Sequence, residues 1–265
     1  MTDILDLGGR VALVTGAGQG VGRQIALHLG GASGSGGVAV NDFVLARAEA
    51  VAEEVRAAGG KAVALQADVS DQASVKAMVE KARAELGPIG ILVNNAGNAG
   101  ANPSPELAKP FWETGPQVWN SFLGVNLYGV VNCTGAVIPG MIERRAPGRI
   151  LTIISDAGRW GDAGLEIYAA AKAGAAGFMR SVARTLGRYQ ITANCVAIAL
   201  TDTPAVQATL HGDQERLKRQ MEKYIIRRPG QPRDIANMIL FLASDASPWI
   251  TGQVYPVNGG FTFAL

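Results

Sequence analysis

Residues 10–22, RVALVTGAGQGVG, decide the fold of this chain. The apolar run Val11–Val14 predicts a short strand buried on both faces of a parallel sheet. A glycine-rich turn follows directly, and an apolar helical run continues to about Leu29. In this order, turn N–H groups and a helix start can hold a pyrophosphate, although a glycine cluster is also compatible with a tight turn alone. The stretch predicts dinucleotide binding by Gly16, Gln19, Gly20, Val21 and Gly22.

A carboxylate closes the second predicted strand, Val38–Asn41, which ends at Asp42. A carboxylate here can accept hydrogen bonds from the ribose hydroxyls of adenosine and would repel the additional phosphate of NADP. Neither Gln19 nor Phe43 supplies a cation to offset that repulsion, so the sequence predicts NAD in preference to NADP, with cofactor contacts from Asp42 and Phe43. The alternative is an aspartate that only caps a helix or a turn. The preceding Gly30–Gly37 stretch is predicted to be a flexible loop.

The ends of the next two predicted strands carry further candidate contacts to the cofactor. The strand at 61–66 is followed by Asp68 and Val69, which suit either an adenine contact or an ordinary turn. The strand at 91–93 is followed by Asn94-Asn95-Ala96-Gly97. Small residues let the backbone approach a flat ligand, and amide side chains can tie neighbouring strands together. We therefore expect cofactor contacts from Asp68, Val69, Asn95, Ala96 and Gly97.

The second half of the chain continues the alternation of helices and strands. The predicted elements are a proline-rich loop at 99–116, helices at 117–143, 168–186 and 232–244, and strands at 148–154, 191–196 and 250–260. The segment 201–224 predicts one helix, with Val206, Leu210, Leu217 and Met221 on one face, in a substrate lid at about 200–228. Together these elements predict a single α/β domain, 1–265, with seven parallel strands and helices on both faces.

Tyr168 and Lys172 lie four residues apart in the predicted helix at 168–186, so they share one face. Free tyrosine has a pKa of about 10, and a nearby cation favours the phenolate and lowers that value. The pair is therefore a plausible device for proton transfer, although such pairs also occur on ordinary helix surfaces. Ser155 follows the strand at 148–154 and can reach the same edge of the sheet, where it would donate to a substrate oxygen.

Composition excludes several classes of function. The net charge is +2 and no basic run occurs, so nucleic-acid binding is not expected. No uninterrupted apolar stretch reaches membrane-spanning length, and the acidic N-terminus does not resemble a signal peptide. Cys133 and Cys195 lie in apolar runs, which predicts buried free thiols in a reducing compartment and a cytoplasmic protein. Their spacing from His28 and His211 fits no metal site.

These motifs together resemble the short-chain dehydrogenase/reductase family along nearly the whole chain. Three groups match in order and spacing: Thr15-Gly16-x-x-x-Gly20-x-Gly22, Asn94-Asn95-Ala96-Gly97, and the set Asn126, Ser155, Tyr168 and Lys172. The resemblance implies a doubly wound Rossmann-type sheet and hydride transfer between a secondary alcohol and a ketone with a nicotinamide cofactor. It also implies a homotetramer built on the helices at 117–143 and 168–186.

The resemblance assigns a role to each member of the catalytic set. It implies that Tyr168 is the acid or base, that Lys172 lowers the tyrosine pKa and holds the nicotinamide ribose, and that Ser155 positions the substrate oxygen. Asn126 would hold a water, although the alternative for this buried amide is a satisfied core residue.

One departure from the family pattern lies after the strand at 191–196. Asn194 and Thr203 match the usual Asn-x-x-x-Pro-Gly-x-x-x-Thr, but Ile198 and Ala199 replace Pro-Gly. Ile198 keeps an N–H that proline lacks, and Ala199 disfavours a positive φ, so the path of the loop beside the nicotinamide is in question. The predicted cofactor contacts from this segment are Ile198, Thr201 and Thr203.

The substrate is open between two chemical classes. Ser155-Asp156-Ala157-Gly158-Arg159-x-Gly161 is similar to the loop of family members that act on hydroxyacyl-CoA esters, including cyclic ones. A free cyclic, terpenoid, steroid or polyol alcohol is the alternative. Candidate substrate contacts are Ser155, Trp160, Tyr168, Leu200 and Val206. A hypothesis from another class is a non-catalytic, NAD-sensing binding protein.

Overall fold

A single parallel sheet organises the molecule. The computed structural model describes residues 3–97, 105–210 and 214–263. Its seven strands lie in the order β3-β2-β1-β4-β5-β6-β7, and every pairing is parallel. The strands are β1 Val11–Val14, β2 Gly37–Asp42, β3 Ala62–Gln66, β4 Ile89–Asn94, β5 Gly148–Ser155, β6 Ile191–Ile198 and β7 Val254–Val257. The predicted doubly wound α/β sheet is confirmed.

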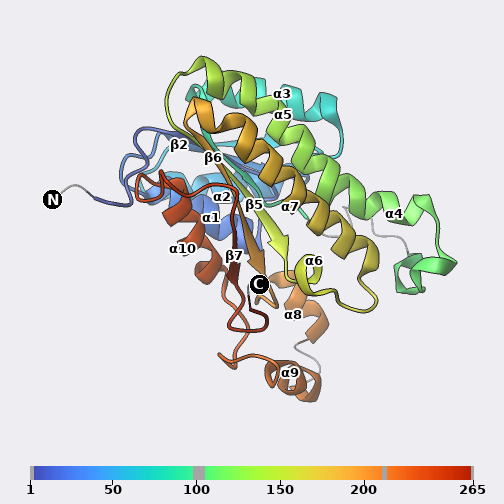
Figure 1. Cartoon of the computed structure of the whole chain (residues 1–265). Helices are drawn as coiled ribbons and strands as arrows, with labels where there is room; N and C mark the ends of the chain where they lie inside the picture. The colour runs from blue at the N-terminus through green and yellow to red at the C-terminus, as the bar shows by residue number, and fades with distance from the viewer. Residues whose placement is uncertain (1–2, 98–104, 211–213, 264–265) are drawn as a thin grey trace.

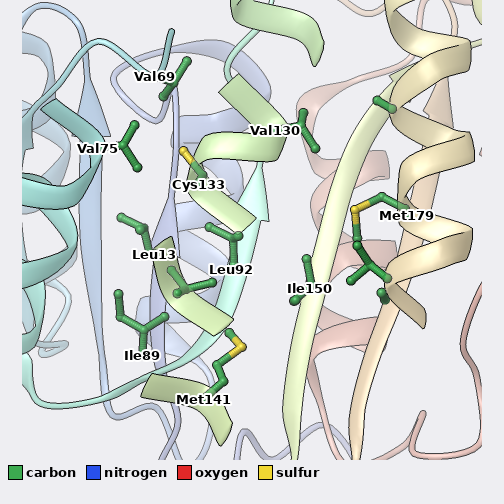
Figure 2. Close-up of a cluster of buried hydrophobic side chains, with 14 of the residues drawn as sticks. Leu13, Val69, Val75, Ile89, Leu92, Val130, Cys133, Met141, Ile150 and Met179 are labelled. Carbon is green, nitrogen blue, oxygen red and sulfur yellow. The ribbon is translucent and has the colours of Figure 1, made fainter. Parts of the chain in front are cut away.

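Helices cover both faces of the sheet (Figure 1). One face carries α1 (Gly20–Gly31), α2 (Leu45–Ala57) and α10 (Pro232–Ala243). The other carries α3 (Gln72–Leu86), α5 (Gly129–Glu143) and α7 (Glu166–Leu186). Successive strand side chains point to opposite faces, so Leu13 packs on the α3/α5/α7 side while Ala12 and Val14 pack on the other. Figure 2 shows the first of these cores, with Leu13 and Leu92 beneath Cys133 of α5.

Strand order sets the place of a ligand site. The chain leaves β1 toward β2 and β3 on one side and toward β4 on the other, so the order reverses between β1 and β4. In open α/β sheets, ligands bind outside the carboxyl ends of the strands at such a switch point. Thr15, at the end of β1, and Asn95, at the end of β4, meet there, since Asn95 N donates to Thr15 Oγ1 over 3.0 Å.

The predicted helix at 117–143 is one continuous helix with a wider turn in its middle. It comprises α4 (Pro116–Leu123), a π-helical turn (Gly124–Tyr128) and α5, and Asn126 lies in the π turn. By length and composition alone, Pro116–Glu143 passes as a membrane-spanning helix, with mean hydropathy 1.4 in its most apolar window. Only 33% of that window is buried, although α5 packs against β4 and α3.

The glycine-rich segment Gly30–Gly37 is shorter as a loop than predicted. Gly30 and Gly31 belong to α1, and Gly37 begins β2. The residues between them are tied to the N-terminal segment, because Leu7 N donates to Ser33 O and Ser33 Oγ donates to Asp6. Gly30 faces Val55 of α2, so absence of a side chain lets two helices approach closely. The prediction of a loop is therefore confirmed only for residues 32–36, and packing against α2 explains the glycine at position 30.

The predicted helix at 201–224 is shorter than expected at both ends, and its described parts are α8 (Pro204–Leu210) and α9 (Gln214–Met221). Met221 is buried and Leu217 is half-buried, while residues 211–213 lie outside the described residues. The proline-rich segment contains the short 3-10 turns Pro105–Ala108 and Phe111–Glu113, and its part at 98–104 also lies outside the described residues.

Candidate active site

A cleft of about 890 Å³ runs along the carboxyl ends of the strands. It gathers every predicted cofactor contact except Thr201: Gly16, Gln19, Gly20, Val21, Gly22, Asp42, Phe43, Asp68, Val69, Asn95, Ala96, Gly97, Tyr168, Lys172, Ile198 and Thr203. Thr201 is instead buried, and it forms an isolated bridge with Gly230. The cleft has the size that is usual for ligand sites in proteins, about 300–1,000 Å³.

The glycine turn after β1 fits the pyrophosphate of a dinucleotide. Gly16 has φ +60°, and a Cβ there would lie 2.8 Å from the Cα of Ala96. Asn95 Nδ2 holds the turn by donating to Thr15 O over 2.9 Å and to Gly16 O over 3.0 Å. The first turn of α1 has no side-chain cap, and its residues line the cleft. Its N–H groups are thus suited to bind an anion.

Asp42 has a turn role and also lies in the wall of the cleft, so its contact to a ribose stays a prediction. Its Oδ2 accepts from Gly18 N over 3.0 Å and its Oδ1 accepts from Val44 N over 3.0 Å. The carboxylate is therefore a turn aspartate, and it also lines the cleft. Arg47, which the sequence analysis missed, lies beside it, since a Cβ on Gly18 would lie 2.5 Å from Arg47 Cβ.

Asp68 likewise has a turn role. Its Oδ1 accepts from Ser70 N over 2.8 Å and from Ser70 Oγ over 2.7 Å. The residue still lines the cleft beside Val69. A contact to adenine from Asp68 stays a prediction.

Tyr168 and Ser155 meet at one end of the cleft. Tyr168 stands in the first turn of α7 and Ser155 is the last residue of β5, and their hydroxyls are close enough to interact. Burial raises the pKa of Tyr168, and the interaction with Ser155 only partly opposes this. The predicted lowering of this pKa by Lys172 is therefore wrong for the protein as described, because desolvation of the phenol prevails.

Lys172 is buried next to this pair. Its Nζ donates to the Ile153 carbonyl over 2.9 Å and lies 5.8 Å from the centroid of the Tyr168 ring. Burial lowers the pKa of Lys172 to about 8. A side chain at position 97 would crowd this site, because a Cβ on Gly97 would lie 3.2 Å from Lys172 Nζ and 3.0 Å from Asn126 Oδ1.

Asn126 is fully buried in the π turn, and its Nδ2 donates to Phe122 O over 2.9 Å. The wider turn places an amide oxygen against Gly97, at the same end of the cleft as Lys172. Asn126, Ser155, Tyr168 and Lys172 thus converge from the π turn, β5 and α7. A phenol, a hydroxyl and an ammonium around one position are suited to hold an oxygen and move a proton.

Comparison with known proteins gives a consistent result. A family model described as "Enoyl-(Acyl carrier protein) reductase" matches residues 16–262. The 3-oxoacyl-[acyl-carrier-protein] reductase FabG of Staphylococcus aureus is 40% identical over 251 residues, covering 94% of this chain and 96% of the relative. The chain belongs to the short-chain dehydrogenase/reductase family.

Two further proteins similar to this chain carry names that specify other compounds than the name of FabG does. The (2S)-[(R)-hydroxy(phenyl)methyl]succinyl-CoA dehydrogenase subunit BbsD of Thauera aromatica is 39% identical over 252 residues, covering 95% of this chain and 96% of that protein. The structure of a 7α-hydroxysteroid dehydrogenase complexed with NADH and 7-oxo glycochenodeoxycholic acid superposes with a TM-score of 0.88 at 33% identity, covering 98% of each chain. The protein is an oxidoreductase acting on CH–OH and ketone groups.

Two of the candidate substrate contacts, Tyr168 and Val206, line the cleft. A third, Ser155, lies beside the Tyr168 hydroxyl. Trp160 is 71% exposed and does not line the cleft, so a substrate contact from Trp160 stays a prediction. Leu200 also lies outside the lining; its N–H donates to Tyr224 Oη over 3.0 Å.

The residues after Ser155 anchor the C-terminal tail of the dehydrogenase. The buried Asp156 carboxylate accepts from Arg159 Nη1 over 2.6 Å and from Asn258 Nδ2 over 2.7 Å. Arg159 in turn donates to Thr262 Oγ1 over 3.2 Å. Asp156 N also donates to Ile198 O over 3.0 Å, so the loop with Ile198-Ala199 keeps the end of β6 paired beside β5. Sequence reasoning missed this clamp because its partners lie about a hundred positions apart.

Proposed function

We propose that this enzyme oxidises a secondary alcohol, or reduces the matching ketone, with Tyr168 as the group that transfers the hydroxyl proton. The observation that carries the proposal is the Tyr168 ring in the wall of a cleft of dinucleotide size, with the Ser155 hydroxyl beside it and the buried Lys172 ammonium 5.8 Å from its centroid. A bound nicotinamide cofactor would supply the hydride acceptor or donor.

The chain's own groups account for the rest of the chemistry. Ser155 holds the substrate oxygen, and Tyr168 accepts its proton during oxidation and returns it during reduction. The Lys172 ammonium donates to Ile153 O, and it is placed to hold a ribose hydroxyl at the end of the cleft. Placing both reactants in one cleft contributes to the rate by removing the cost of bringing them together.

NAD is the proposed cofactor, in preference to NADP. The support is the Asp42 carboxylate in the wall of the cleft, together with a solved relative that holds NADH. Arg47 favours the second candidate, NADP, because it places a cation on the same wall. Initial rates with both cofactors in parallel decide between them: a kcat/KM that is higher with NADP would overturn the proposal.

For the substrate we propose an acyl thioester. The support comes from two relatives whose names specify an acyl-[acyl-carrier-protein] and an acyl-CoA. The rival is a free cyclic alcohol, which the steroid dehydrogenase favours. A panel of hydroxyacyl-CoA esters, the corresponding free acids and cyclic alcohols tests this, and turnover of the free compounds alone would exclude the thioester. Retained NAD binding without turnover of any compound would favour a non-catalytic role.

We also propose a homotetramer in the cytoplasm. The α4–α5 helix is apolar but only 33% of its most apolar window is buried, and Tyr128 and Val131 on it are exposed. A second copy packed on this helix and on α7 would cover them. The free, buried thiols of Cys133 and Cys195 suit a reducing compartment. Light scattering after size exclusion should give four copies, and Val131→Arg should shift the mass downward.

A further inference from the structure

A second pocket, distinct from the long cleft, opens on the other side of Tyr168. It has a volume of about 430 Å³ and lies between the segment 107–122 and the segment 163–168. Tyr168 is the only residue that lines both spaces among the described residues. A group attached to a carbon that reacts at Tyr168 therefore has this pocket beside it, in addition to the cleft.

Aromatic rings dominate the lining of this pocket. They are Phe111, Trp112, Trp119, Phe122 and Tyr168. Phe111 and Trp112 meet edge to face, with centroids 5.4 Å apart, and Phe122 meets Tyr168 edge to face at 6.2 Å. Such contacts are the preferred geometry for aromatic groups, and a further ring can join them in the same way.

The polar groups of the pocket are already paired. Lys109 Nζ lies 2.8 Å from Glu106 Oε1, and Glu166 Oε1 accepts from Gly164 N over 3.0 Å. Trp119 Nε1 donates to Thr114 Oγ1 over 2.9 Å, which fixes the indole in place. The larger part of the surface that lines the pocket is therefore apolar, and Trp112, which is 70% exposed, has surface left to bury.

We propose that this pocket receives a hydrocarbon ring, aryl or alicyclic, carried by the carbon that reacts at Tyr168. The inference rests on the proposed function and adds the shape of the substrate to it. A dry cavity of about 150 Å³ already holds benzene, so the pocket accommodates one ring with room for its attachment. A straight methyl or ethyl group would leave most of the aromatic surface uncovered.

The test compares two ketone substrates that differ only in this group: benzoylacetyl-CoA carries phenyl where acetoacetyl-CoA carries methyl. The variant is Trp119→Leu, and the control is Trp249→Leu, because Trp249 is 97% exposed and lines neither space. Wild type should prefer the phenyl substrate. Trp119→Leu should lower the kcat/KM for the phenyl substrate about tenfold or more and should change the kcat/KM for the methyl substrate little. Equal losses for both substrates, or none, would overturn the proposal.

A binding measurement separates this inference from the proposed function. Phenylpropanoyl-CoA and butanoyl-CoA lack the ketone, so calorimetry reports their affinity without turnover. Tighter binding of the phenyl compound, lost in Trp119→Leu, supports the ring pocket even if neither ketone is reduced. If neither thioester binds, acetophenone and acetone provide the same phenyl-to-methyl comparison, and equal affinity in that pair would exclude the pocket as a ring site.

Discussion

Lys172 Nζ lies 5.8 Å from the centroid of the Tyr168 ring and donates a 2.9 Å hydrogen bond to the carbonyl of Ile153. The two side chains lie one turn apart on α7, and both are largely removed from water. Burial disfavours both charged forms, so it raises the pKa of the phenol and lowers that of the ammonium to about 8. Activity and stability should therefore both depend on pH in the alkaline range.

Tyr168→Phe removes the proton-transferring hydroxyl and keeps the ring that contacts Phe122. We expect turnover to fall about 100- to 10,000-fold, the usual contribution of an acid–base group, while the affinity for NAD changes little. Steady-state rates and calorimetric titration with NAD measure the two quantities. Tyr189→Phe, on the short turn after α7, is the control. A Tyr168→Phe enzyme with most of its activity would exclude this residue as the acid or base.

The direction of the Tyr168 pKa predicts opposite pH profiles for the two reactions. Oxidation needs the phenolate, whose population grows as pH rises toward a pKa above the ordinary tyrosine value. Reduction needs the protonated phenol, which is lost over the same range. The rate of oxidation should therefore rise through alkaline pH while the rate of reduction falls. Profiles of kcat/KM in both directions check this, and parallel profiles would contradict it.

Lys172→Met should change how stability depends on pH. Because the pKa of Lys172 is about 8 in the folded protein, against an ordinary lysine value of 10.5, the unfolded chain binds more protons between these two values. Stability of the cofactor-free protein should thus rise with pH across that window, by up to about 3 kcal/mol. The Met variant should lack this rise, whereas Lys76→Met, at an exposed position on α3, should keep it. Urea unfolding at pH values across the window measures the effect.

Asp42→Asn tests cofactor choice without removing every acceptor at that position. The neutral amide keeps one oxygen for Gly18 N or Val44 N but no longer repels a phosphate. We expect KM for NAD to rise about tenfold, corresponding to a hydrogen bond to a charged group, and the ratio of NADP to NAD activity to increase. Initial-rate kinetics with both cofactors measure the ratio. An unchanged ratio would mean that the carboxylate serves the turn alone.

Asp156→Asn should weaken the clamp on the C-terminal tail. It replaces the buried carboxylate that accepts hydrogen bonds from Arg159 and Asn258 by a neutral amide. The guanidinium of Arg159 would then lose its ion pair while it stays only partly exposed to water. We expect a loss of about 1–3 kcal/mol in the free energy of unfolding. Thermal unfolding measures it, with Glu85→Gln, at an exposed position on α3, as the control. A variant as stable as wild type would show that the network does not hold the tail.

Local patterns predicted most of the fold and the members of the cleft. The apolar run Val11–Val14 and the glycine turn after it carried enough information to place a strand, a turn and a helix. The helix at 117–143 was predicted within a residue at its start, but its π turn was not, because π turns are rare and the apolar residues around Gly124–Tyr128 do not mark one. The segment at 201–224 was predicted as one helix, since polar and apolar residues continue their helical spacing across both pieces.

The sequence by itself determined the parallel sheet, the pyrophosphate turn and the set of side chains at the carboxyl edge, because each follows from neighbours along the chain. Tertiary structure alone decided the raised pKa of Tyr168, the Asp156 clamp and the aromatic pocket beside the reacting phenol. Each of these depends on burial or contact between distant segments. No local spacing specifies how much water remains around a group or which distant residue fills the space beside it.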